Sequence, residues 1–149
     1  MEPNASALRV VTYNIHKCRG MDRKVQPERI VEVLHHIGAD VVALQEVLSI
    51  ESRHRRDDQA RFIAEELRLH QAFGHTRWLH GGRYGNVVLT RFPIRVSRNY
   101  DLTARRREPR GCLRVDIQLH TTLLHVFNLH LGTGYLERRR QARRLWQER

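Results

Sequence analysis

The sequence has little of what secreted, membrane-spanning or zinc-binding proteins usually carry. Its two cysteines, Cys18 and Cys112, lie far apart, which excludes the paired spacing of a zinc site and the density of a disulfide scaffold. Residues 1–7 lack the basic start and apolar run of a secretory signal, and the longest purely apolar runs, such as residues 41–44, are too short to cross a bilayer. We therefore expect reduced thiols, no transmembrane segment and a soluble, cytoplasmic protein.

Lysine is scarce although the chain is strongly basic. Its formal charge of +11 comes from 27 basic and 16 acidic residues, and only Lys17 and Lys24 are lysines. Arginine forks match phosphate oxygens in two-point contacts, so a phosphate-bearing partner is favoured, nucleic acid first. Anionic lipid head groups and other polyanions fit the same charge, and arginine-rich usage also follows from genomic base composition. The ten histidines show no His-x-His or His-Glu-x-x-His spacing.

The first part of the chain alternates strand, helix and strand. With 149 residues, 40% of them hydrophobic, it is long enough for one domain with a core. Residues 8–13 are rich in β-branched side chains and predict a strand that is interrupted at Asn14. Pro27 opens a helix that Gly38 ends, and residues 41–44 predict a buried strand. This alternation is typical of an α/β domain.

The rest of the chain reads as shorter, mostly β elements. Asp57 or Asp58 is a candidate cap for a second helix. Residues 72–79 are ambiguous but strand-like, residues 85–90 predict a strand that Pro93 stops, and residues 101–110 predict a polar loop. Residues 113–119 and 123–129 alternate as an antiparallel hairpin does, and residues 136–149 predict a basic helix.

Three polar residues stand where apolar strands end. The Glu46 carboxylate is costly to bury unless a cation or a donor partners it, although a surface glutamate at a strand edge fits equally well. The Asn14 amide can donate to a phosphate oxygen, or it can simply form a turn. His130 has an ordinary pKa near neutrality, which suits proton transfer, but strand-end histidines also serve as structural hydrogen-bonders.

Three further residues are candidates for phosphate contact. Arg110 lies between Pro109 and Gly111, in a turn that can aim its guanidinium inward, whereas the neighbouring Arg105, Arg106 and Arg107 suit a solvated patch that steers anions. Asn86 is also explained as a turn residue, and Tyr84 as a packing residue.

Five segments match, in order, the motifs of one superfamily. They are Thr12-Tyr13-Asn14-Ile15, Leu44-Gln45-Glu46-Val47, Gly85-Asn86-Val87-Val88-Leu89-Thr90-Arg91-Phe92-Pro93-Ile94, Glu108-Pro109-Arg110-Gly111 and Asn128-Leu129-His130-Leu131-Gly132. On these segments the chain resembles the N-terminal part of an endonuclease/exonuclease/phosphatase domain. Deoxyribonuclease I-like enzymes, abasic-site endonucleases, sphingomyelinases and inositol-polyphosphate phosphatases belong to this superfamily.

The resemblance implies metal-dependent phosphoester hydrolysis by the intact protein. It makes Glu46 a ligand of Mg²⁺, or alternatively Mn²⁺, places Asn14 in the same metal site, and puts His130 near the scissile phosphate. Arg110, Asn86 and Tyr84 are then the expected phosphate-binding residues. Nucleic acid is the favoured substrate, phospholipids and phosphoinositides are alternatives, and a non-catalytic basic module that binds polyanions remains open.

The resemblance also implies the fold, an α/β (α+β) αββα sandwich of roughly 250 residues. We expect residues 1–149 to form its N-terminal half, with one mixed, mostly antiparallel sheet and helices on one face. The superfamily's Gly-Asp-Phe-Asn and Ser-Asp-His segments are absent from these residues. We therefore expect an incomplete domain with little or no turnover, whose exposed apolar sheet face self-associates or requires the other half.

Overall fold

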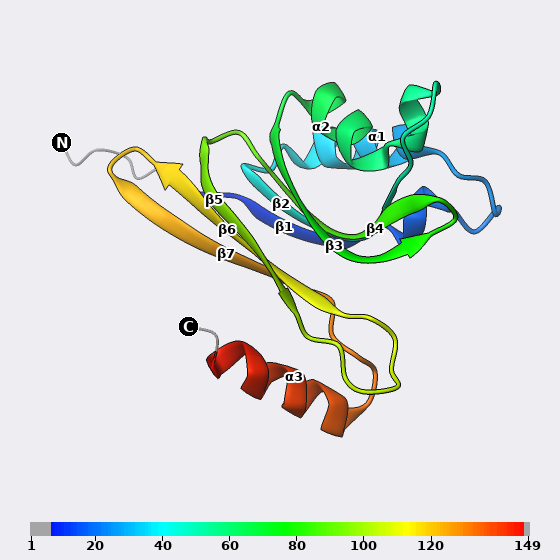
Figure 1. Cartoon of the computed structure of the whole chain (residues 1–149). Coiled ribbons are helices and arrows are strands. Elements are labelled where there is room, and N and C mark those ends of the chain that lie inside the picture. Colours follow the sequence, from blue (N-terminus) through cyan, green and yellow to red (C-terminus); the bar gives the residue numbers. More distant parts are fainter. Residues whose placement is uncertain (1–6, 148–149) are drawn as a thin grey trace.

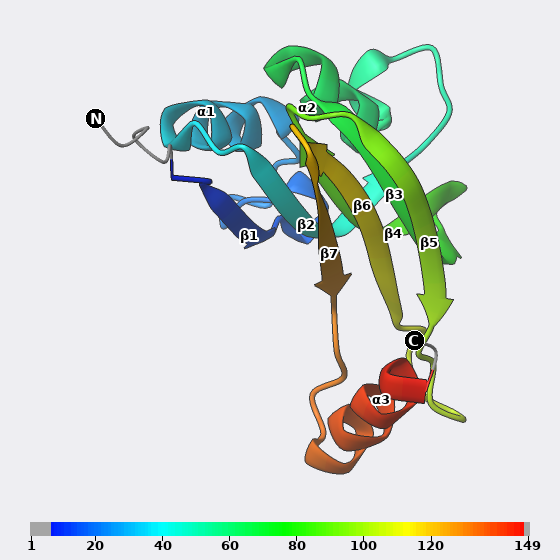
Figure 2. The ribbon, with the colours of Figure 1, turned by 90° about the vertical axis from the view of Figure 1, so that its left-hand side faces the viewer.

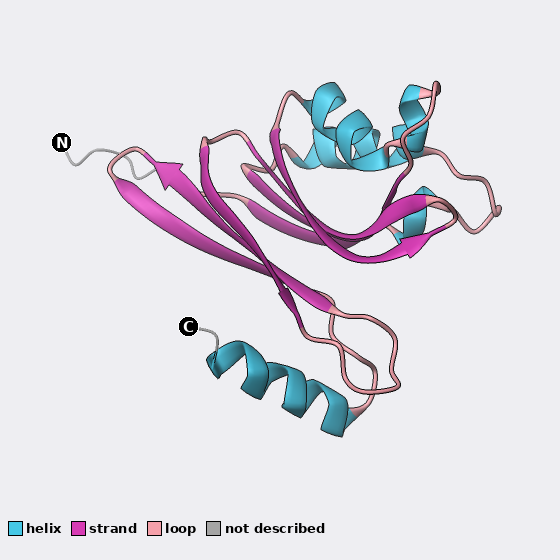
Figure 3. Ribbon diagram, in the orientation of Figure 1, coloured by secondary structure: helices cyan, strands magenta, loops and turns pink. Residues whose placement is uncertain are grey.

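The computed structural model describes residues 7–147, which build two β-sheets and three α-helices (Figures 1 and 3). In chain order the elements are β1 (Val10–Asn14), the 3₁₀ turn η1 (His16–Cys18), α1 (Pro27–Ile37), β2 (Val41–Ser49), the 3₁₀ turn η2 (Arg55–Asp57), α2 (Gln59–Leu67), β3 (His70–Leu79), β4 (Gly82–Thr90), β5 (Ile94–Asp101), β6 (Gly111–Leu119), β7 (Thr122–Leu129) and α3 (Tyr135–Gln147).

The first sheet has four strands in the order β1-β2-β4-β3. β1 and β2 run parallel, and the other neighbours are antiparallel. The β1–β2 crossover contains α1, which ends at Gly38 with φ 62° as predicted. α1 and α2 cover one face of this sheet (Figures 1 and 2), where Leu34 and Ile63 pack against strand residues such as Leu44.

The second sheet has three antiparallel strands in the order β5-β6-β7 and packs on the other face of the first sheet. Alternate residues of β6, among them Val115 and Ile117, point at Val41 and Val88 of the first sheet and are fully buried. The mixed, mostly antiparallel α+β sandwich is thus confirmed. The expectation of a single sheet is wrong, because residues 94–129 already form the layer that covers the first sheet.

Most predicted elements are confirmed, with two differences among the strands. Asp58 caps α2 by accepting a hydrogen bond from the backbone nitrogen of Arg61 at 3.2 Å. β2 continues past Leu44 through a bulge to Ser49. β5 was not predicted, because it is an edge strand with mostly exposed, polar side chains. Residues 148–149 of the predicted C-terminal helix lie outside the described part of the chain.

An apolar surface is exposed on the second sheet. Leu123 and Phe127 of β7 are 42% and 39% exposed. α3 lies beyond one end of this sheet (Figures 1 and 2), and a groove of about 260 Å³ between the two elements has an apolar lining of Phe127, Leu129, Leu131, Ala142, Leu145 and Trp146. Within residues 7–147 no helix has the length and apolar character that a membrane crossing requires.

Candidate functional site

Glu46 occupies a β-bulge in β2, an inner strand of the first sheet. The pairing of β2 with β4 shifts register between Leu44 and Val47, and Glu46 adopts a left-handed conformation with φ 57°. A β-bulge re-aims a side chain and is frequent beside active sites. The bulge thus leaves the Glu46 carboxylate only 16% exposed and directed at side chains from β1, η1 and the end of β7.

Asn14 meets Glu46 because β1 and β2 are parallel neighbours with Asn14 opposite Gln45. The Asn14 Nδ2 donates to Glu46 Oε1 at 2.9 Å, and its Oδ1 accepts from the backbone nitrogen of His16 at 3.1 Å. Asn14 therefore orients the carboxylate. Its direct ligation of a metal stays a prediction.

Two residues of η1, His16 and Lys17, complete the surroundings of Glu46 and were missed in the sequence. The His16 Nδ1 donates to Glu46 Oε2 at 2.9 Å, and the Lys17 Nζ lies 3.7 Å from the same oxygen. His16, Lys17 and Cys18 all have positive φ, a conformation that costs about 1–2 kcal/mol per residue. Such strain is common at functional sites. The only signal in the sequence was their position directly after the Asn14 segment.

His130 and Arg110 approach Glu46 from the second sheet. The His130 Nε2 lies 3.8 Å from Glu46 Oε1, and the Arg110 Nη1 lies 3.1 Å from the His130 Nδ1. The same Nη1 lies 3.3 Å from the His130 Nε2, and because arginine only donates, the unprotonated one of the two ring nitrogens accepts. Arg110 also donates through Nη2 to Glu108 at 2.9 Å, whereas its buried Nε has no hydrogen-bond partner among residues 7–147. A buried donor without a partner is costly and marks a place for an acceptor.

A small pocket connects these groups. It has a volume of about 10 Å³, room for one water-sized group, and its lining is Glu46, Thr76, Tyr84, Gly85, Asn86, Pro109, Arg110, Gly111 and His130. The structure thus brings five predicted residues into one pocket, with Asn14 behind Glu46. The Asn86 amide nitrogen is held by the backbone oxygens of Gly111 and Asn128, and the Tyr84 ring lies between Lys17 and Arg77.

The site keeps Glu46 ionised. Burial by itself raises the pKa of Glu46, but hydrogen bonds from Asn14 and His16, with the charge of Lys17, lower that pKa from 4.5 to about 2. Burial lowers the pKa of His130, and the Arg110 guanidinium lowers it further. Burial and the Glu46 carboxylate raise the pKa of Tyr84 to about 12. Near neutral pH the pocket therefore contains a carboxylate, a neutral phenol and a guanidinium.

An ionised carboxylate such as that of Glu46 is a ligand that Mg²⁺ accepts. Among residues 7–147 no three His, Cys, Asp or Glu side chains come together as a metal cluster. Mg²⁺ is commonly bound through one or two carboxylates, with water and substrate phosphate supplying the other ligands. The ionised Glu46 carboxylate meets that requirement, whereas the Asn14 amide turns its nitrogen toward the carboxylate and its oxygen toward the His16 backbone.

The profile of the Endonuclease/Exonuclease/phosphatase family matches residues 11–149. The chain belongs to this family. Among curated proteins it is 28% identical to the uncharacterized protein YbhP of Escherichia coli K12 over 145 residues, which cover 91% of this chain and 57% of YbhP. The chain thus spans little more than half the length of this relative.

Solved structures share the fold. An endonuclease/exonuclease/phosphatase from Beutenbergia cavernae matches with a TM-score of 0.82 and 27% identity, over 95% of this chain and 44% of its own. D. rerio TDP2, solved in complex with a single-stranded DNA product, matches with a TM-score of 0.69 and 17% identity, over 95% of this chain and 54% of its own. At that identity TDP2 shares the fold only.

Proposed function

We propose that the intact protein hydrolyses phosphoesters by Mg²⁺-dependent attack of water, with Mn²⁺ as an alternative ion, and that residues 1–149 alone have little or no turnover. One observation carries the proposal. An ionised carboxylate and an arginine whose buried Nε–H has no partner among residues 7–147 line the same pocket, together with a histidine. Family membership supports a phosphoesterase of the nuclease or phosphatase type.

Each side chain has a separate task in this proposal. When bound, Mg²⁺ supplies positive charge against the phosphoryl oxygens and the leaving group, and Glu46 is the residue that would hold it. Asn14 and His16 keep the carboxylate ionised and oriented through hydrogen bonds of 2.9 Å each. Arg110 offers its buried Nε–H to a phosphate oxygen, and Arg110 in turn contacts His130, which faces the phosphate or the leaving group. Tyr84 and Asn86 line the phosphate pocket.

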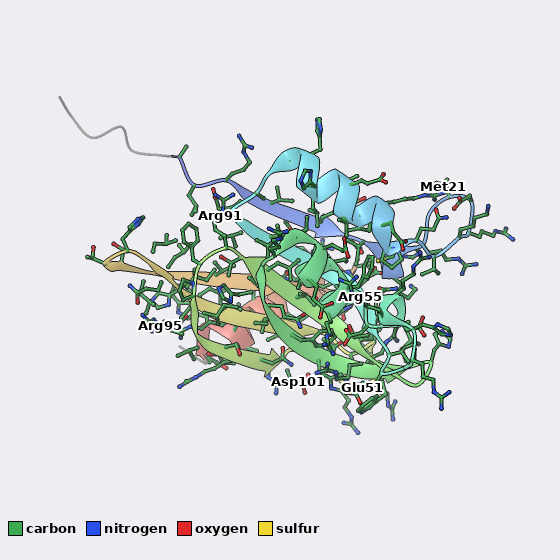
Figure 4. The ribbon with its side chains drawn as sticks, turned by 90° about the horizontal axis from the view of Figure 1, so that it is seen from above. Met21, Glu51, Arg55, Arg91, Arg95 and Asp101 are labelled. Carbon is green, nitrogen blue, oxygen red and sulfur yellow. The ribbon has the colours of Figure 1, made fainter. Side chains whose placement is uncertain are left out.

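Nucleic acid is the substrate class that we favour. The formal charge of +11 gives the chain a general attraction to polyanions. Many arginines are already paired with carboxylates, as Arg55 is with Glu65 and Glu66 and Arg91 with Asp40. Arg55 also lies apart from Arg91 and Arg95 (Figure 4). The DNA product is a property of TDP2, but it makes DNA the first substrate to test. Phospholipids and phosphoinositides are the alternative substrate classes, because the same five sequence segments fit enzymes that act on them. The free, buried Cys18 and Cys112 suit a cytoplasmic location.

A second candidate is a basic module without catalytic activity. It is favoured by the single carboxylate at the pocket and by the lack of a three-residue metal cluster within residues 7–147. Such a module binds nucleic acid with a strong dependence on salt and no dependence on Mg²⁺.

The test is an assay of bis(p-nitrophenyl) phosphate and plasmid DNA, with and without Mg²⁺, on this chain and on any longer in-frame product of its gene. We expect the longer product to hydrolyse these substrates in a reaction that requires Mg²⁺ and that Glu46→Ala abolishes, and residues 1–149 alone to show little or no hydrolysis. Robust hydrolysis by the Glu46→Ala variant would contradict the proposed role of Glu46. DNA binding that does not depend on Mg²⁺ would favour the second candidate, the basic module without catalytic activity. A continuation past codon 149 that encodes Gly-Asp-Phe-Asn would support an incomplete domain.

A further inference from the structure

Three buried amide side chains connect the two sheets directly beneath the site. We propose that Asn128, together with Gln45 and Asn86, is a positioning residue that fixes His130 relative to Glu46. This inference rests on the proposed function of that site, but it is stated in terms of geometry, which can be measured without metal or turnover.

The three amides lie in the interior and their hydrogen bonds form one network. Gln45, Asn86 and Asn128 are 8%, 1% and 2% exposed. The Gln45 Nε2 donates to Asn128 Oδ1 at 2.7 Å, and the Asn128 Nδ2 donates to the backbone oxygens of Leu44 and Val87 at 2.8 and 2.9 Å. The Asn86 Nδ2 donates to the backbone oxygens of Gly111 and Asn128 at 3.1 and 3.3 Å.

Each end of this network is next to a site residue. Gln45 directly precedes Glu46 on the bulge of β2, and Asn128 lies on β7 two residues before His130. Gly111, whose oxygen Asn86 holds, directly follows Arg110. The hydrogen bonds therefore tie the backbone that carries Glu46 to the strands that carry His130 and Arg110.

Apolar packing alone does not set this alignment. The side chains that join the two sheets, such as Val88 and Val115, are non-directional contacts that tolerate small sliding. Hydrogen bonds are directional, and buried polar networks that are fully satisfied specify a single arrangement. Loss of Asn128 would remove the donor that its amide provides to the oxygens of Leu44 and Val87, at the point where β2 bulges.

The experiment measures how much the chemical shifts of the His130 ring change when the Glu46 carboxylate is removed. The ring resonances of His130 are recorded by ¹H–¹³C NMR at pH 8 in the wild type, in Asn128→Ala and in Thr90→Ala. Each of these three proteins is compared with the same protein carrying Glu46→Gln in addition. Thr90 is a fully buried polar residue at the opposite end of β4, where its Oγ1 accepts from Phe92, and it serves as the matched control. We expect the shift caused by Glu46→Gln to fall below one third of its wild-type size in Asn128→Ala and to be retained in Thr90→Ala.

Gln45→Met is the second variant, for use if Asn128→Ala does not fold. It removes the hydrogen bond from Gln45 to Asn128 and leaves both hydrogen bonds from the Asn128 amide to backbone oxygens in place. We expect it to reduce the same response. We also expect Asn128→Ala to weaken Mn²⁺ binding about tenfold, as loss of a group behind a metal ligand commonly does. An undiminished response of His130 in both variants, or loss of the fold in both, would overturn the proposal. If wild type binds no Mn²⁺ while the NMR response depends on Asn128, the proposed function fails and the positioning role stands.

Discussion

The His130 Nε2 lies 3.8 Å from the Glu46 Oε1, although the two residues come from different sheets. Glu46 stands on the bulge of β2, and His130 follows β7. The pocket therefore exists only when the two sheets are packed together. Its chemistry depends on the sandwich as a whole and not on one strand.

We predict that Glu46 makes folding stability depend on pH in acid. Hydrogen bonds and nearby cations outweigh burial and lower the pKa of Glu46 from 4.5 to about 2, so over this range the unfolded chain binds more protons at this position than the folded protein. The stabilisation is fully present above pH 4.5 and is lost as the pH falls through about 2. We expect the wild type to exceed Glu46→Gln by on the order of 1–3 kcal/mol at pH 6, measured by urea unfolding, and by much less at pH 2.5.

The control for that experiment is Glu32→Gln, which changes an exposed carboxylate on α1. It should leave the pH profile nearly unchanged. A gap between wild type and Glu46→Gln that stays constant from pH 6 to pH 2.5 would contradict the lowered pKa.

We predict that Arg110→Lys weakens phosphate binding. The three donors of a lysine ammonium sit on one nitrogen and cannot reproduce the spaced guanidinium fork, in which Nη1 contacts His130, Nη2 contacts Glu108 and Nε is left over. Hydrogen bonds to charged groups contribute about 1.5–3 kcal/mol, which corresponds to a loss of at least about tenfold in affinity. Isothermal titration with inorganic phosphate in the presence of Mg²⁺ measures it, with exposed Arg105→Lys as the control. Equal affinities for wild type and Arg110→Lys would remove Arg110 from the site.

We predict that Gly85→Ala destabilises the fold. A Cβ atom at Gly85 would collide with the backbone oxygen of Gly74 on the neighbouring β3, and backbone cannot move aside as a flexible side chain does. Overpacking of this kind costs about 1–3 kcal/mol or more. Thermal unfolding should show a clear loss for Gly85→Ala and little change for Gly134→Ala, whose Cβ would meet nothing closer than 3.8 Å. Equal melting temperatures for the two variants would show that β3 and β4 are not so close.

We predict that Arg105, Arg106 and Arg107 accelerate association with nucleic acid without contributing to binding at high salt. All three side chains are exposed on the loop that precedes Arg110. Such charges steer an anion over distances comparable with the Debye length, about 10 Å at 0.1 M salt. Replacement of all three by glutamine should slow association with DNA severalfold at 50 mM salt and not at 500 mM, measured by stopped-flow fluorescence. A loss of the same size at both salt concentrations would instead indicate direct contacts.

The sequence allowed prediction of those parts of the fold that local signals encode. Pro27 and Gly38 mark the ends of α1, and Asp58 marks the start of α2, because caps and terminators act within a few residues. β5 has no such signal, since an edge strand can consist of polar residues such as Arg95 and Arg98. The second sheet was missed for a related reason, because packing between sheets depends on contacts between distant residues.

The candidate site shows the same division. Asn14 and Glu46 could be brought together from the sequence, because parallel strands place their ends at one edge of a sheet. His16 and Lys17 could not, since their place over Glu46 depends on three consecutive left-handed residues without glycine. The loop that follows them reaches outward to Met21 (Figure 4) and gives no hint of the turn. Gln45 and Asn128 were seen only as parts of matching segments, and their 2.7 Å hydrogen bond required the packed sheets.

Titration of the chain with Mn²⁺, followed by electron paramagnetic resonance and repeated with competing Mg²⁺, tests whether Glu46 holds a divalent ion and does not require turnover. We expect one bound Mn²⁺ per wild-type chain, its displacement by Mg²⁺, and binding weakened on the order of a hundredfold or lost in Glu46→Gln but not in Glu32→Gln. Equal Mn²⁺ affinity in the wild type and Glu46→Gln would contradict it.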